Sequence, residues 1–505
     1  MLNYLTRSMT SSSSCPSSIQ TRSGPLDGDV LWMQPKHVSE HVWNGEPDRK
    51  LHIRRAVPTY QGEEQIPEEI VPLLRQCGFY WIMKMGYLKI NAALITAFIE
   101  RWRPEIHTFH LRCGEAIITL QDVSVLLGLR IDGAPLVGST NLVWADLCEE
   151  LLGEGEIEGS VVKLSWLAHH FSHINIDEGN VEQLQRFTRA WILRFIGGVV
   201  FVNKTSSRVS LRYLQFLRDF EQCSTYAWGP AVLAYLYREM CSATDYKVKS
   251  IGGMWLRRGN QHIGNDDLRL FRRKLDLMKR HEFVWEPYTP TVMAALPPIC
   301  VVGSVAWFAV VPLICFHVVE WHQPDRVLRQ FGLQQPIPGC PSQPQNLHGI
   351  TLKGKQDENW FHLQWNNRAE FRVDVYPRQQ GLLGYNSDYM VWYRGHHTDT
   401  STSEHSFGGV AETQPHFSWP TMTPSQQHDA PMAKPNALFA PQWNVPGAIP
   451  DMGDLLGVDL HQEFSAEAEQ AEAGRQRGRR NPDRQAQRWD RPCGTSSRHH
   501  GHHND

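Results

Sequence analysis

The chain has 505 residues, of which 41% are hydrophobic and 20% are charged, and its formal net charge is -3. This length and composition are those of a globular protein with one large domain or two average ones. Because the net charge is small, the protein as a whole has no strong electrostatic attraction to nucleic acid, acidic lipid or basic partners. Any such attraction must come from a local group of charges.

The two ends of the chain differ in composition from the middle. Residues 1–26 hold eight Ser, Arg7 and Arg22 and no acidic residue, which predicts a disordered Ser-rich leader, with an organellar transit peptide as the alternative; no apolar run indicates a secretory signal. Residues 397–505 are rich in Ser, Thr, Pro, Gln and His and predict a disordered, low-complexity tail.

Most of the 18 Trp and 20 Phe lie between these ends, which places the packed domain at residues 27–396, with a Pro/Gly-rich break near 336–350. The fold class we predict is mainly α: a single large helical domain with a small β-hairpin element, flanked by disordered N- and C-terminal tails. Ten cysteines are spread over the chain without a CxxC pair, which is typical of reduced thiols rather than of a disulfide framework or a zinc site.

The first helices are indicated by apolar spacing and by their end residues. One is predicted after Pro67 and ends at Gly78, with Ile70, Leu73, Leu74 and Cys77 at helical spacing. The next begins at Asn91, a candidate N-cap, and runs through Trp102 to the stop at Pro104.

The stretch TFHLRCGEAIITLQDVSVLLGL carries three local signals that agree. Residues 108–111 and 116–118 predict two short strands about a turn at Cys113-Gly114. Thr119 then caps a helix with Asp122 as the acid of a capping box, and Gly128 ends it. Since Gly133 and Pro135 prevent residues 131–138 from forming a recognition helix, we favour a structural helix over DNA-groove binding.

Later helices are predicted from three- and four-residue apolar spacing at 140–152, 164–172, 181–196, 210–221, 229–243, 266–280 and 304–321. Residues 299–316 are uncharged and long enough to span a membrane, but Pro312 and Gly303 interrupt them, so we predict a buried core helix. A short helix DRVLRQF closes on Gly332, and the aromatic residues of 351–396 are expected to pack on the core.

The run ALITAFIERWRPEIHTFHLRCGEAIITLQDVSVLLGLRIDGAPLVGS resembles the signature block of the plant mobile domain. Further similar blocks follow in the family's order over roughly residues 30–396: LRDFEQCSTYAWGPAVLAYLYREMCSAT, FVWEPYTPTVMAALPPICVVGS, AVVPLICFHVVEWHQPDRVLRQFGLQQPIP and DYMVWYR. The chain departs from the family's pattern after Ile251-Gly252-Gly253, where MWLRRGNQHIGNDD stands in place of a Leu-rich, Trp-containing helix.

The resemblance implies a non-enzymatic, MAINTENANCE OF MERISTEMS-like nuclear protein, with a role in meristem maintenance, genome integrity and transposon or gene silencing through protein or chromatin interaction. A transposon-encoded DNA-binding accessory protein is the alternative, and a host gene and a transposon-derived copy both remain open. Proteins of this family are often labelled aminotransferase-like or serine/threonine-protein phosphatase long form homolog.

The residues themselves predict no enzyme. The metal-binding blocks of a two-metal phosphatase, GDxHG, GDxxDRG and GNHE, are absent from the sequence, as are a GxSxG motif and a Gly-rich phosphate loop. We therefore predict no catalytic residue, no metal site, no cofactor and no small-molecule substrate, and keep a metal-dependent phosphatase-like hydrolase as the least favoured alternative.

Two histidine groups have ligand-like spacing. Among His169, His170 and His173, two imidazoles at i and i+4 or i and i+3 share one face of a predicted helix, but without a third ligand we favour a solvated or packed helix end. His499–His503 are expected to be incidental to the tail.

Seven arginines of the tail, within 475–491, are candidate nuclear-localisation or nucleic-acid contacts: Arg475, Arg477, Arg479, Arg480, Arg484, Arg488 and Arg491. We expect a nuclear location, with the cytoplasm or a plastid as alternatives, and protein partners in the nucleus or on chromatin. Weak nonspecific nucleic-acid contact through the basic tail is also expected, and no membrane contact is.

Overall fold

The computed structural model describes residues 31, 33–54, 66–84, 91–139, 141–153, 155–174, 180–254, 267–339, 360–374 and 376–397. The chain divides into two units, Met1–Ala448 and Ile449–Asp505, and every described residue lies in the first. The predicted leader, the tail beyond residue 397 and residues 340–350 of the predicted break lie outside the described residues.

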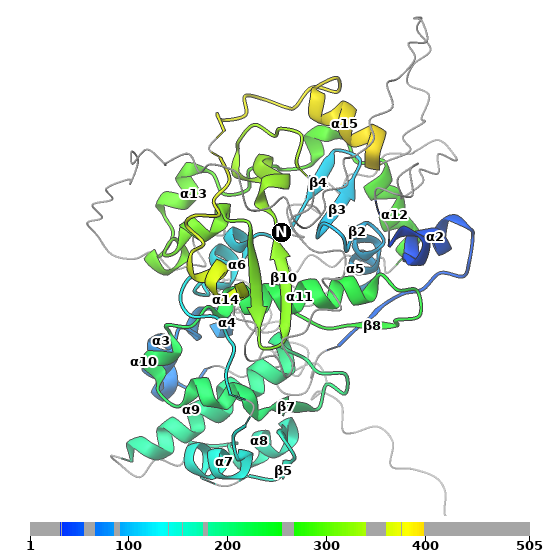
Figure 1. The fold of residues 1–505 in the computed structure, drawn as a ribbon. Coiled ribbons are helices and arrows are strands. Elements are labelled where there is room, and N and C mark those ends of the chain that lie inside the picture. Colours follow the sequence, from blue (N-terminus) through cyan, green and yellow to red (C-terminus); the bar gives the residue numbers. More distant parts are fainter. Residues whose placement is uncertain are drawn as a thin grey trace, which may run out of the picture. The chain divides into compact units, whose positions relative to one another are not determined.

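Helices make up most of the regular structure (Figure 1). The α-helices among the described residues are α2 (Val38–Trp43), α3 (Val71–Gln76), α4 (Tyr80–Lys84), α5 (Ala92–Ile99), α6 (Leu120–Leu127), α7 (Trp144–Leu152), α8 (Leu164–His170), α9 (Val181–Phe195), α10 (Phe220–Cys223), α11 (Trp228–Ala243), α12 (Leu268–Asp276), α13 (Pro290–Ala294), α14 (Trp360–Asn366) and α15 (Asp388–His397). The mainly helical prediction therefore fits the described residues, whereas a single domain is not established.

Strands form four small sheets within the described part of the chain. One sheet is the parallel pair β1 (His52–Ile53) and β8 (Ser250–Ile251), and another is the antiparallel hairpin of β9 (Val311–Cys315) and β10 (Val318–His322). The third is the antiparallel sheet of β2 (Trp102–Arg103), β3 (Thr108–Leu111) and β4 (Gly114–Ala116). The fourth is the antiparallel sheet of β5 (Ile157–Glu158), β6 (Val161–Lys163) and β7 (Arg208–Ser210). The sequence predicted the β3–β4 hairpin alone, with its second strand two residues later than observed.

The end signals of α5 and α6 are confirmed. Asn91 Oδ1 accepts a hydrogen bond from the Leu94 amide, at 2.9 Å. Thr119 Oγ1 accepts from the Asp122 amide at 3.0 Å while the Asp122 carboxylate accepts from the Thr119 amide at 2.7 Å, which is the predicted capping box. Gly128 ends α6 with φ of +60°, in the left-handed region that glycine adopts without strain.

The predicted helix at 304–321 is wrong. A 3₁₀ turn, Ser304–Phe308, is followed by the hairpin of β9 and β10, with Glu320 opposite Leu313. A continuous apolar run fits a buried strand as well as a buried helix. All residues of both strands are buried, so no exposed polar face gave the sequence a period that distinguishes a strand from a helix. No helix among the described residues combines the length and the apolar character needed to cross a membrane.

Other predicted helices have different bounds or types. The segment 210–221 is split into a 3₁₀ helix, Leu211–Leu217, and α10. The prediction that α5 continues through Trp102 is also wrong, because Trp102 pairs with Phe109 in the β2–β3 sheet and Pro104 disfavours helical backbone before it. The short helix before Gly332 is a 3₁₀ segment, Pro324–Phe331, and Gly332 closes it at φ of +72°.

The core is centred on α11, which packs against α6, β9 and β10 (Figure 1). The residues after the predicted break return to this core, as expected from their aromatic content. Phe361 and Trp365 are 1% exposed, and the Trp365 indole donates to the Gly133 carbonyl at 2.9 Å. Tyr393 donates from its hydroxyl to the Leu111 carbonyl at 2.8 Å, so α15 is fixed to β3.

Candidate functional site

Of the residues that the sequence suggested as sites, the structure describes only the histidines at the end of α8. The seven arginines between Arg475 and Arg491 lie outside the described residues, as do His499–His503. His169, His170 and His173 are exposed at the end of α8, where the His170 ring stacks on Trp166 with centroids 4.8 Å apart. The exposure of all three side chains and the ring contact of His170 fit the predicted solvated or packed helix end.

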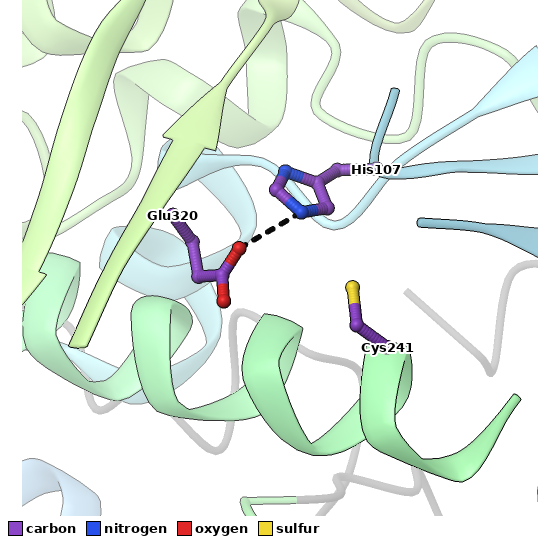
Figure 2. A group of neighbouring side chains, drawn as sticks. All are labelled: His107, Cys241 and Glu320. Carbon is purple, nitrogen blue, oxygen red and sulfur yellow. Dashed lines mark ion pairs between the residues drawn. The ribbon is translucent and has the colours of Figure 1, made fainter. Parts of the chain in front are cut away.

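A different group of ionisable side chains gathers inside the core. His107, Cys241 and Glu320 offer donor atoms that all lie within 4.8 Å of one another, and they are the one such group of three within the described ranges (Figure 2). His107 lies in the turn between β2 and β3, Cys241 in the last turn of α11, and Glu320 in β10. The fold therefore brings together three segments that are far apart in the sequence.

His107 is fixed by contacts to both ring nitrogens. Its Nδ1 lies 2.9 Å from the Trp321 carbonyl oxygen, which only accepts, so Nδ1 carries a hydrogen. Its Nε2 lies 3.0 Å from Glu320 Oε2. The backbone of His107 has φ of +52°, a left-handed conformation that costs a non-glycine residue about 1–2 kcal/mol, so the fold holds this ring against its local preference.

Glu320 is fully buried and has a second charged partner. The guanidinium of Arg238, one turn before Cys241 on α11, donates through Nε to Glu320 Oε1 and through Nη2 to the Val319 carbonyl at 3.1 Å. A buried carboxylate is stable only when paired and hydrogen-bonded. Arg238 therefore fixes one oxygen of Glu320 and leaves the other directed at His107.

Cys241 is held by an aromatic wall. Trp102 in β2 donates its indole N–H to Cys241 Sγ at 3.2 Å. The His107 ring lies against the rings of Trp102 and Tyr237, with centroids 5.8 and 5.0 Å away, and Tyr237 is on the same helix as Cys241. The three donor atoms are thus enclosed by apolar rings rather than open to water.

The electrostatics of the cluster favour a cation at its centre. Burial lowers the pKa of His107, but the Cys241 sulfur and the Glu320 carboxylate outweigh burial and raise it to about 9. Either a proton on Nε2 or a metal ion between Nε2, Sγ and Oε2 satisfies these donors. A nucleophile–base relay needs its carboxylate on one ring nitrogen and its thiol on the other, whereas here Nδ1 faces the Trp321 carbonyl and Nε2 faces Glu320.

None of these three residues was singled out from the sequence. Glu320 follows the uncharged run 299–316 and lies inside the wrongly predicted helix at 304–321, where it had no reason to face His107. The usable signal was a lone carboxylate inside the apolar run VVEWH, because a glutamate in a fully buried segment must have a partner.

Comparisons with known proteins agree with the blocks seen in the sequence. A model of the plant mobile domain matches residues 78–256 and 253–394, and these matches adjoin where the sequence departs from the family's pattern. The chain is 30% identical to Protein MAINTENANCE OF MERISTEMS of Arabidopsis thaliana, over 82% of this chain and 95% of that protein.

Two other Arabidopsis thaliana proteins are similar over part of their length. The chain is 37% identical to a Serine/threonine-protein phosphatase 7 long form homolog, over 74% of this chain and 32% of that protein. It is 30% identical to Protein MAIN-LIKE 2, over 74% of this chain and 61% of that protein. The chain thus spans less than two thirds of either relative, and no solved structure matches it.

Proposed function

Because the chain belongs to the plant mobile domain family, we propose that it is a non-enzymatic nuclear protein that supports meristem maintenance and genome integrity, including transposon or gene silencing, through protein or chromatin interaction. The observation that carries the proposal is the alignment with Protein MAINTENANCE OF MERISTEMS, which extends over 95% of that relative. A match over 82% of this chain extends far beyond one motif.

The burial of the central cluster supports a role without catalysis. His107 and Glu320 are 1% and 0% exposed, so a substrate dissolved in water does not reach them. The word phosphatase in the name of one relative adds little, because the chain spans 32% of that protein. We expect the purified full chain to release no phosphate from a generic phosphate ester with added Mn²⁺; turnover that a chelator abolishes contradicts the proposal.

The nuclear location is tested with the tail arginines. The full chain, fused to a fluorescent protein in plant cells, should accumulate in the nucleus. Replacement of all seven arginines between Arg475 and Arg491 by Gln should shift it to the cytoplasm, whereas replacement by Lys keeps the positive charge and should preserve nuclear accumulation. Exclusion of the wild type from the nucleus contradicts the proposed location, and unchanged accumulation of the Gln variant contradicts the role of the arginines.

A DNA-binding accessory protein, with its DNA contact on the helical domain rather than on the tail, is the second candidate function. Guanidinium groups that neutralise phosphates make binding fall with salt, by a slope of about 0.9 per phosphate contact in a log–log plot. The two candidates differ in where the chain contacts DNA. A contact made by the tail arginines is lost in the Gln variant, whereas a contact made elsewhere on the chain is kept. DNA binding that persists in that variant with a slope of several contacts favours the accessory protein.

A further inference from the structure

We propose that His107, Cys241 and Glu320 bind one zinc ion, which links the β2–β3 turn, α11 and β10 from inside the core. Such a site goes beyond the proposed function, because a nuclear interaction protein needs no metal to act. It follows from the donor atoms, their outer contacts and their spacing.

Each of the three side chains is oriented by a further contact, which for His107 and Glu320 is made by the atom that would not bind the ion. His107 Nδ1 donates to the Trp321 carbonyl, Glu320 Oε1 accepts from Arg238, and Cys241 Sγ accepts from the Trp102 indole. Outer hydrogen bonds of these kinds fix the ligands of zinc sites and select the histidine nitrogen that binds. Here they direct Nε2, Oε2 and Sγ toward a common point (Figure 2).

The spacing of the donors is close to that of three of the four ligands of a tetrahedral zinc ion. Zinc bonds of about 2.0–2.3 Å to nitrogen, oxygen and sulfur place neighbouring ligand atoms roughly 3.3–3.6 Å apart. His107 Nε2 and Glu320 Oε2 are 3.0 Å apart, and all three donors lie within 4.8 Å of one another. Shifts of about 1 Å or less therefore suffice to seat the ion.

The donor set favours zinc among the common ions. Magnesium and calcium prefer oxygen donors alone, whereas zinc accepts imidazole, thiolate and carboxylate together. A dication also offsets the negative charges of a buried thiolate and a buried carboxylate, which are costly to desolvate without a counter-charge. The left-handed backbone of His107 is one more sign that the ring position is enforced by the fold.

The test starts from the full chain with His499, His500, His502 and His503 replaced by Ala, because the terminal histidines themselves bind divalent ions. Mass spectrometry of the purified protein should find one zinc ion per chain. After removal of zinc with a chelator, added Co²⁺ should give the intense visible bands of tetrahedral cobalt and a thiolate-to-cobalt charge-transfer band.

Cys241→Ser should abolish the charge-transfer band. Cys148→Ser is the matched control, because Cys148 is also a buried cysteine in a helix, α7, but is not in the cluster, and it should retain the band. Glu320→Gln should weaken Co²⁺ binding by roughly tenfold or more. A band that survives in Cys241→Ser overturns the proposal, as does a parent protein, with only the four tail histidines replaced, that binds neither zinc nor Co²⁺ in a one-to-one ratio.

X-ray absorption at the zinc edge of the protein in which only the four tail histidines are replaced keeps the proposal testable if the further variants do not fold. One sulfur ligand, with nitrogen or oxygen as the others, is the expected shell. A shell without sulfur, or with several sulfurs, overturns the assignment. If His107 holds a proton instead of an ion, that protein contains no stoichiometric zinc, which also overturns it.

Discussion

His37 shows how one neutral imidazole serves several contacts. Its Nδ1 accepts from the Ser39 amide at 3.1 Å and thereby caps α2, while Nε2 donates to the Trp102 carbonyl at 2.7 Å. Arg103 Nη1 lies 3.1 Å from the same Nδ1. Burial, followed by the charge of Arg103, holds the pKa of His37 well below its usual value, so the folded protein keeps this ring neutral.

A pH dependence follows from that depressed pKa. Below about pH 6.5 the unfolded chain protonates this histidine and the folded chain does not. The free energy of unfolding therefore decreases as the pH is lowered, by at most about 1.4 kcal/mol per pH unit. His37→Asn retains a capping oxygen and should be less stable at about pH 7.5, but its free energy of unfolding should fall less steeply toward about pH 5. Urea unfolding at a series of pH values measures this; parallel curves for the two proteins contradict it.

Gly133 is required by a close backbone approach. Its φ is +95°, and a Cβ at this position would stand 2.0 Å from the Thr225 carbonyl oxygen. Gly133→Ala should therefore cost about 3 kcal/mol or more of the free energy of unfolding. Gly159→Ala is the control, since Gly159 also has positive φ, +65°, but has no atom within 4 Å of the added Cβ, and should cost about 1 kcal/mol. Equal losses in urea unfolding would show that the carbonyl contact is not the cause.

At the scale of elements, β4 is joined to the segment Pro324–Phe331 by a buried ion pair. Arg326 donates to both oxygens of Glu115, at 2.8 and 2.7 Å, and both side chains are buried. Glu115→Gln should cost about 3–5 kcal/mol, because it leaves the guanidinium buried without its carboxylate. The double variant Glu115→Gln, Arg326→Met should recover much of the loss. A double variant as unstable as the sum of the two single ones contradicts this coupling.

The sequence predicted the elements whose signals lie within a few residues. Thr119, Asp122 and Gly128 set both ends of α6, and Asn91 set the start of α5, because capping needs only near neighbours. Prediction from the sequence was wrong for β9 and β10, because both strands are fully buried and neither has an exposed polar face. It also missed the β1–β8 pair, whose partners His52 and Ser250 are joined by no local pattern.

The candidate site belongs to the whole molecule and was not predictable for the same reason. His107, Cys241 and Glu320 come from a turn, a helix and a strand, and no spacing rule for zinc ligands covers such a set. The absence of a CxxC pair from the sequence argues against a local zinc motif, although metal sites also form from distant residues. The contact between Trp102 and Tyr237 and the packing of β10 on α11 help to bring the donors together.

The proposed function is a claim about the whole chain, and its most direct test is replacement of the relative that it matches over 95% of that protein's length. The full chain is expressed in Arabidopsis thaliana plants that lack Protein MAINTENANCE OF MERISTEMS, beside plants that regain that protein itself. Our account predicts that both sets of plants recover normal meristems. The account is contradicted if meristems recover only in the plants that regain Protein MAINTENANCE OF MERISTEMS, although this chain accumulates in nuclei to the same level as that protein.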